Sequence, residues 1–259
     1  MPFANVHHAQ IHYALEGSQE KSALIFSNSL GATLSMWDPQ LAECQKSFRV
    51  LRYDTRGHGK SSVTLGPYAI EQLAKDVLAL ADSLSIDRFH FCGLSMGGQT
   101  GMWLASNAPQ RLHRLILCNT AARIGSAEMW DARVDTVRRN GMSYIAPAVI
   151  ERWFTTAFRQ ENPAVIGNIR TALEQTNPEG YTANCAAVRD FDFRERLSQI
   201  HTPTLVISGA HDPATTPADG QFLAKHIAGA RYVELDAAHL SNIETADRFT
   251  REVVAFLNS

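Results

Sequence analysis

The stretch Gly93-Leu94-Ser95-Met96-Gly97 decides the fold of this chain. It follows the pattern G-x-S-x-G, with residues 88–92 before it and residues 98–105 after it. The first of these runs predicts a buried strand and the second predicts a helix. Small residues on both sides let the backbone turn sharply between them, so the serine hydroxyl points away from the sheet. We therefore expect Ser95 to be a nucleophile.

A serine nucleophile needs a histidine base, and the histidine needs an acid that orients it. On a strand-to-helix turn of this kind, the acid and then the histidine follow the serine along the chain. Residues 203–209 predict a strand, and Asp212 lies in the turn directly after it, where open parallel sheets place their ligand sites. A turn aspartate before a proline is also common for structural reasons. We predict Asp212 as the acid, with Asp190 and Asp192 as rivals that fit the order of elements less well.

The predicted base is His239. The chain holds 10 histidines, so the choice depends on their positions. Residues 231–235 predict another strand, and His239 lies among small residues in the loop between that strand and a final helix over residues 245–257. Among the ten, His239 alone follows Asp212 in a loop after a strand.

An oxyanion formed at the serine needs two backbone N–H groups aimed at it. One should come from Met96, the residue after the serine. The other should come from the loop Asn28-Ser29-Leu30-Gly31, which follows a predicted strand over residues 23–27. We predict Leu30 as that second donor, and expect its loss to cost about 3 kcal/mol of transition-state stabilisation.

A glycine-rich run, Asp54-Thr55-Arg56-Gly57-His58-Gly59-Lys60-Ser61, follows the predicted strand over residues 48–53. It is interpreted as a structural turn. No helix N-terminus with a P-loop lysine follows it, so nucleotide binding is not expected.

Composition is that of an ordinary globular protein. The chain has 259 residues, of which 45% are hydrophobic and 19% charged, which fits one domain with an insertion. A net charge of −2 favours neither a nucleic-acid partner nor a membrane surface. Scattered cysteines (Cys44, Cys92, Cys118 and Cys185) and the absence of a signal peptide favour the cytoplasm. We expect no metal and no organic cofactor, and the oligomeric state cannot be inferred.

Predicted strands and helices alternate from residue 3 to about 119 and again from 202 to 259. Helices are expected over residues 36–46, 70–83, 96–108 and 245–257, and a strand over residues 112–119. This alternation predicts an α/β fold with a mostly parallel sheet covered on both faces. Between the two blocks the sequence is helix-like, broken at Gly141, Pro147, Pro163 and Pro178. We predict a core over 1–120 and 191–259, with a helical lid over 121–190 that excludes water from the serine.

The whole chain resembles the 3-oxoadipate enol-lactonases of the α/β-hydrolase superfamily. The residues that carry the resemblance are Ser27-Asn28-Ser29-Leu30-Gly31, Met36-Trp37-Asp38-Pro39-Gln40, Tyr53-Asp54-Thr55-Arg56-Gly57-His58-Gly59, Gly93-Leu94-Ser95-Met96-Gly97-Gly98, Trp153-Phe154-Thr155, Gly180-Tyr181 and Asp236-Ala237-Ala238-His239. Hydrolases of this superfamily usually carry His-Gly where this chain has Asn28-Ser29, and a backbone donor tolerates that change.

The resemblance implies an α/β-hydrolase fold and hydrolysis of an enol-lactone during aromatic degradation, with Ser95, His239 and Asp212 acting covalently. The substrate is expected to be a small lactone that bears a carboxylate, so a cationic partner is expected. The lid supplies Arg123, Arg133, Arg138, Arg139, Arg152 and Arg159. We predict Arg133, three positions after Trp130 on the same helix face, together with Trp153 and Ser29.

Other functions remain open on sequence alone. A general carboxylesterase or a cofactor-free perhydrolase would use the same three residues. A non-enzymatic small-molecule receptor of the same fold would keep them and turn substrate over slowly.

Overall fold

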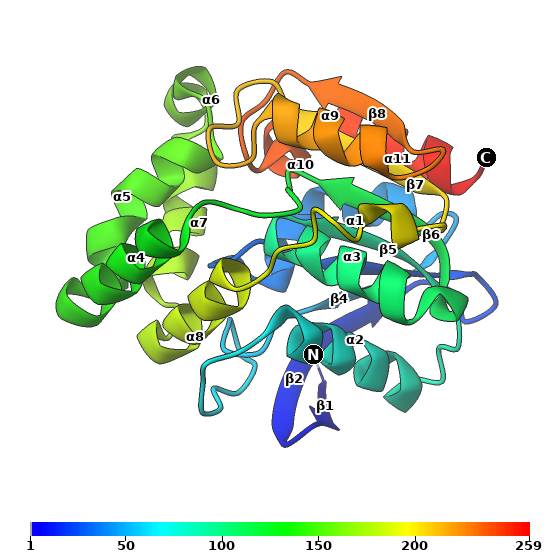
Figure 1. Cartoon of the computed structure of the whole chain (residues 1–259), viewed down its shortest axis with the longest axis horizontal. Coiled ribbons are helices and arrows are strands. Elements are labelled where there is room, and N and C mark those ends of the chain that lie inside the picture. The colour runs from blue at the N-terminus through cyan, green and yellow to red at the C-terminus, as the bar shows by residue number, and fades with distance from the viewer. Residues whose placement is uncertain (1) are drawn as a thin grey trace.

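The computed structural model describes residues 2–259, and its centre is an eight-stranded sheet in the order β1-β2-β4-β3-β5-β6-β7-β8 (Figure 1). The strands are β1 (Phe3–Val6), β2 (Ala9–Glu16), β3 (Ala23–Ser27), β4 (Arg49–Tyr53), β5 (Phe89–Leu94), β6 (Leu112–Cys118), β7 (Thr204–Gly209) and β8 (Arg231–Leu235). The hairpin β1–β2 joins the sheet antiparallel to β4, and every pairing from β4 to β8 is parallel. The predicted mostly parallel sheet is therefore confirmed.

Helices cover both faces of this sheet. They are α1 (Asp38–Cys44), α2 (Ile70–Ser83), α3 (Met96–Asn107), α9 (Pro217–His226) and α11 (Ala246–Leu257). Because side chains alternate along a strand, Leu24 and Phe26 of β3 pack with Trp37 in one apolar cluster, whereas Ile25 packs with Val77 of α2 in another. The first cluster includes residues of α1 and α11, and the second includes residues of α2, α3 and α9.

Most predicted boundaries agree with the structure. Helix α2 coincides with the predicted range, and β6 ends one residue before the predicted end at Asn119. The helix predicted over residues 36–46 is instead a 3-10 turn, η1 (Leu34–Trp37), followed by α1. Pro39 explains the division, because proline is favoured in the first turn of a helix and disfavoured inside one.

The segment between β6 and β7 is helical, as predicted. It contains α4 (Ala127–Asn140), α5 (Met142–Trp153), α6 (Thr156–Glu161), α7 (Pro163–Glu174) and α8 (Pro178–Arg189). Figure 1 shows these five helices gathered on one side of the sheet. Gly141, with φ 77°, separates α4 from α5, while Pro163 and Pro178 begin α7 and α8.

The predicted break at Pro147 is wrong, since α5 continues through it. Proline removes one backbone hydrogen bond from a helix interior. Ala146 and Val149, on either side of it, are both buried, and this packing holds the helix together across the missing bond. No helix within residues 2–259 is long and apolar enough to cross a membrane.

Candidate active site

Ser95 lies on the turn between β5 and α3, with φ 58° and ψ −114°. A positive φ is uncommon for any residue with a side chain, so the surroundings must enforce it. A Cβ atom on Gly93 would lie 2.1 Å from the Gly97 carbonyl oxygen, and one on Gly97 would lie 2.2 Å from the Ser27 carbonyl oxygen. The Ser95 N–H donates to the Cys118 carbonyl oxygen of β6 at 2.9 Å. Close backbone contact with both neighbouring strands therefore fixes the turn.

Asp212 and His239 follow β7 and β8, two adjacent parallel strands. His239 Nδ1 lies 2.7 Å from Asp212 Oδ2, and both side chains are buried. With Nδ1 donating to the carboxylate, Nε2 is left to accept a proton. Ser95 and His239 line one cavity. No hydrogen bond joins Ser95 Oγ to His239 among the described residues, and such bonds are often long before substrate binds.

The Asp212 carboxylate is surrounded by donors. Besides His239, Oδ2 accepts from Thr215 Oγ1 at 2.7 Å and from Asn119 Nδ2 at 3.0 Å. Oδ1 accepts the N–H groups of Ala214 and Thr215 at 2.8 and 3.1 Å. Burial by itself raises the pKa of Asp212, but the charge of His239 and these side-chain hydrogen bonds outweigh it and lower the pKa below its ordinary value. The carboxylate therefore stays ionised beside the histidine.

Two backbone N–H groups close to Ser95 in the chain or in the cavity have no hydrogen-bond partner in the described part of the chain. Among residues 2–259, the N–H groups of Leu30 and Met96 donate no hydrogen bond. Leu30 lines the same cavity as Ser95, and Met96 directly follows the serine at the first position of α3. This arrangement suits two donors held ready for an oxyanion.

The loop that carries Leu30 is held by polar contacts that the sequence did not reveal. Asn28 Nδ2 donates to the Tyr53 carbonyl oxygen at 2.8 Å, and Asn28 Oδ1 accepts from the Trp37 indole at 2.9 Å. The Gly31 N–H donates to His58 Nε2 at 2.8 Å. Burial lowers the pKa of His58 to about 4, so the ring is neutral and can accept this bond. The glycine-rich run after β4 thus supports this loop, the predicted oxyanion loop.

The cavity that contains Ser95 has a volume of about 400 Å³. It is lined by Ser29, Leu30, Ser95, Ile124, Gly125, Met129, Trp130, Arg133, Val149, Arg152, Trp153, Tyr181, Pro213, Ala214 and His239. Loops that follow strands supply Ser95, His239 and Leu30, and the segment between β6 and β7 supplies most of the other walls. The structure thus brings Ser29, Arg133 and Trp153, which were selected from the sequence, to the serine.

A sequence model of the alpha/beta hydrolase fold matches residues 22–246. The chain belongs to the α/β-hydrolase family. It is 47% identical over 247 residues to 3-oxoadipate enol-lactonase 2 of Acinetobacter baylyi, and the aligned region covers 95% of this chain and 92% of that protein.

Solved structures resemble this hydrolase along its whole length. The enol-lactonase from Burkholderia xenovorans LB400 superposes with a TM-score of 0.98 at 53% identity and covers 100% of both chains. A thermophilic esterase from Thermogutta terrifontis, in a structure with malate bound, superposes with a TM-score of 0.91 at 30% identity over 96% of this chain and 93% of that one.

Two arginines of the hydrolase face its cavity. Arg133 on α4 and Arg152 on α5 are half-buried and line the cavity together. Arg133 donates to the Tyr181 hydroxyl at 3.2 Å and lies 5.5 Å from the Trp130 ring. Burial, followed by the nearby charge of Arg133, lowers the pKa of Arg152. Neither arginine pairs with a carboxylate of residues 2–259, so the cavity suits an anionic ligand.

The remaining candidates lie away from this cavity. The rival acids Asp190 and Asp192 pair with their neighbours Arg189 and Arg194 on the surface. Of the other lid arginines, Arg123 pairs with Asp192, Arg139 with Asp135 and Arg159 with Glu151, and Arg138 lines a separate cavity.

Glu244 connects the helical segment to the loop that carries His239. Its carboxylate accepts the Ala238 N–H at 2.9 Å and both the N–H and the hydroxyl of Thr155. Ala238 precedes His239, and Thr155 lies between α5 and α6. Sequence reasoning did not find Glu244, because its contact with Thr155 joins residues far apart in the chain.

Proposed function

We propose that this hydrolase opens the ring of 3-oxoadipate enol-lactone and releases 3-oxoadipate. The observation that carries the proposal is one cavity that holds Ser95, His239 and two arginines without carboxylate partners. A reactive acyl centre and an anionic end of one small molecule fit such a site. The names and similarity of the relatives from Acinetobacter baylyi and Burkholderia xenovorans support the same substrate.

The first half of the reaction acylates Ser95. His239 Nε2 takes the hydroxyl proton while Ser95 Oγ attacks the lactone carbonyl carbon, and Asp212 stabilises the imidazolium that forms. The N–H groups of Leu30 and Met96 hold the resulting oxyanion. When the intermediate collapses, the ring C–O bond breaks and its electron pair leaves with the enolate oxygen. His239 returns the proton to the leaving group.

The second half releases the product. The enol stays tethered to the acyl group because both belonged to one ring, and it converts to the ketone. A water molecule gives a proton to His239 and attacks the acyl carbonyl through the same oxyanion site. Collapse returns the proton to Ser95 and frees the second carboxylate.

We assign Arg133 and Arg152 to the carboxylate that the lactone already carries. Guanidinium groups bind carboxylates through charge-assisted hydrogen bonds, and both side chains already face the cavity. Ser29 and Trp153 complete the proposed substrate walls. We also propose that residues 121–190 act as the lid that excludes water, and that the reaction takes place in the cytoplasm, where four buried free cysteines would stay reduced.

The test measures loss of the ultraviolet absorbance of the enol-lactone, with a neutral nitrophenyl ester as the second substrate. We expect kcat/KM of about 10⁴–10⁸ M⁻¹s⁻¹ on the lactone, far above that on the ester, and no turnover by Ser95→Ala. Arg133→Gln and Arg152→Gln should raise KM for the lactone and spare the ester. Full activity of Ser95→Ala would refute the mechanism, and equal losses on both substrates would refute the carboxylate contact.

A general carboxylesterase is the second candidate, because the Thermogutta terrifontis esterase is 30% identical to this chain. A preference for the neutral ester over the lactone would move the assignment to that function.

A further inference from the structure

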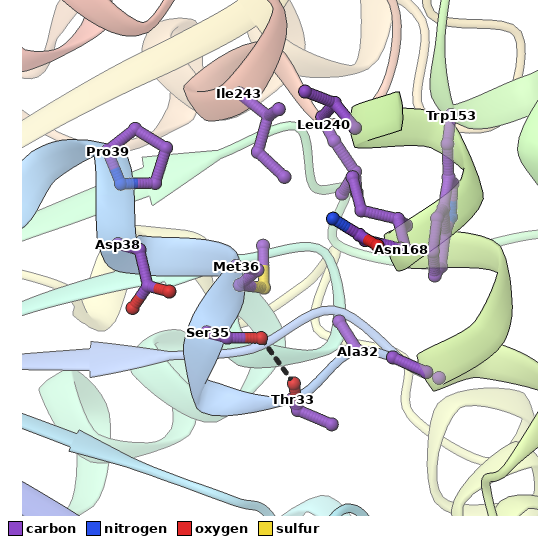
Figure 2. A pocket seen from close by; sticks show the side chains of 14 residues that line it. Ala32, Thr33, Ser35, Met36, Asp38, Pro39, Trp153, Asn168, Leu240 and Ile243 are labelled. Atoms are coloured by element: carbon purple, nitrogen blue, oxygen red, sulfur yellow. Dashed lines mark hydrogen bonds between the residues drawn. The ribbon is translucent and has the colours of Figure 1, made fainter. Parts of the chain in front are cut away.

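A second cavity lies behind the catalytic one, and Trp153 lines both. Its volume is about 250 Å³. Figure 2 shows Met36 near its middle, Leu240 and Ile243 along one side, Trp153 at one end, and Asp38 and Pro39 at the other. Asn168 lies beside Trp153 with its amide toward the space, so the lining at this end is mixed, and the single carboxylate lies at the far end.

The two cavities meet along a thin wall. Leu30 lines the catalytic cavity while the next residue, Gly31, lines the second. In the same way His239 lines the first and Leu240 lines the second. Trp153 lies between these two loops: its carbonyl oxygen accepts the Leu240 N–H at 3.0 Å, and a Cβ atom on Gly31 would lie 3.7 Å from its Cη2.

Within this wall, the Trp153 indole can be removed by mutation without changing a loop that carries a proposed reacting group. The other parts are backbone of the oxyanion loop and of the histidine loop. Trp153 is buried, at 5% exposure, whereas Ser35, Asp38 and Asn168 of the second cavity are exposed. Truncating the indole would therefore join the catalytic cavity to a second cavity that is open to solvent. The joined space would reach from the acyl carbon at Ser95 to the apolar side chains of Met36 and Ile243.

We infer that Trp153 sets the length of the acyl chain that this hydrolase accepts, by separating the serine from the second, partly apolar cavity. The inference rests on the proposed acyl hydrolysis at Ser95. Asp38 at the far end disfavours a second carboxylate there. Met36, Leu240 and Ile243 offer apolar contacts, so the second cavity suits an uncharged alkyl chain. The wild-type enzyme therefore rejects long acyl chains that the truncated enzyme would take.

The test compares nitrophenyl acetate, butyrate, hexanoate and octanoate in wild type, Trp153→Phe and Trp153→Ala. Each buried methylene is worth about fourfold in binding, so Trp153→Ala should raise the octanoate-to-acetate ratio of kcat/KM at least about tenfold over wild type. Trp153→Phe, which folds more readily, should give a smaller rise in the same direction. An unchanged ratio in both variants would overturn the inference.

Ile169→Trp supplies the matched control, because Ile169 lines the second cavity and not the catalytic one. Alone it should leave all four esters unaffected. Combined with Trp153→Ala it should abolish the gain on octanoate. If the double variant keeps the gain on octanoate, the gain comes from a general loosening of the site, and the inference is overturned.

The ester series also separates this inference from the proposed substrate. If the enzyme hydrolyses the esters but not the enol-lactone, the lactonase function is refuted. The ester series then still measures which acyl-chain lengths the enzyme accepts. If the enzyme hydrolyses neither the lactone nor the esters, binding can be measured without catalysis. The rise in Tm caused by octaneboronic acid, compared with that caused by ethaneboronic acid, then reports whether a long chain fits the joined space. Equal rises in wild type and Trp153→Ala would then overturn the inference.

Discussion

Replacing His58 with glutamine should flatten the acid dependence of stability while keeping the oxyanion loop in place. Burial lowers the pKa of His58 to about 4 in the folded protein, whereas the unfolded chain titrates near the ordinary value of about 6.5. Above pH 6.5 neither state binds the extra proton. As the pH falls from 6.5 to 4, only the unfolded state binds it, so His58 reduces the free energy of unfolding over this window.

The expected size follows from the two pKa values. The interval between 6.5 and about 4 corresponds to about 3 kcal/mol of unfolding free energy, most of which is lost by pH 4.5. Glutamine does not titrate, and its amide oxygen can accept the Gly31 N–H that His58 Nε2 now accepts. The free energy of unfolding, measured in urea, should therefore fall between pH 7.5 and pH 4.5 by about 2–3 kcal/mol less in His58→Gln than in wild type.

His90 provides the matched control. Burial, followed by the charges of His113 and Arg114, lowers the pKa of His90 to about 4 as well, but His90 lies inside β5 and not at the oxyanion loop. His90→Gln should weaken the acid dependence without changing kcat. His58→Leu removes the acceptor for Gly31 and should lower kcat at pH 7.5. An acid dependence of His58→Gln equal to that of wild type would mean that the folded protein also protonates His58, which refutes the reasoning.

Two further predictions concern positioning of the base. Asp212→Asn should lower kcat about 10⁴-fold with little change in KM, because the amide holds His239 in the wrong tautomer; initial rates within tenfold of wild type would contradict the assignment. Glu244→Gln should lower both Tm and kcat/KM by weakening charge-assisted bonds to Thr155 and Ala238. A Tm loss with unchanged kinetics would show that Glu244 supports the fold without positioning the loop of His239.

The order of motifs along the chain was enough to predict that Ser95, Asp212 and His239 would lie together at one edge of the sheet. Ser95, Asp212 and His239 each follow a strand of one parallel sheet, and parallel strands bring their carboxyl ends to a common edge. A residue directly after a strand can therefore be placed in space from its place in the sequence. The same reasoning could have found Asn119 and Thr215, which hydrogen-bond to Asp212 and also follow strand ends.

The helical segment shows where sequence reasoning stops. Six of its arginines were candidates for binding the substrate carboxylate. Their positions in the sequence show which neighbours share a helix face, but not which face lines the cavity. Arg133 was chosen because Trp130 shares its helix face, and it lines the cavity. Arg152 lines the same cavity but was not chosen. Its place in the cavity depends on how α5 packs against α4 and α7, and those contacts join residues far apart in the chain.

The contacts of the oxyanion loop also divide into those that the sequence predicts and those that depend on packing. A backbone donor at Leu30 could be predicted because it needs only a loop after β3. The neutral ring of His58 could not, since its pKa depends on burial beneath α8, where Asn184 Nδ2 donates to the Arg56 carbonyl oxygen at 2.8 Å. The sheet thus brings Ser95, Asp212 and His239 to one edge, whereas packing of the inserted helices fixes the ionisation of His58 and the shape of the cavity. For this reason the triad can be predicted from one sequence, while substrate length and charge selection need the folded structure.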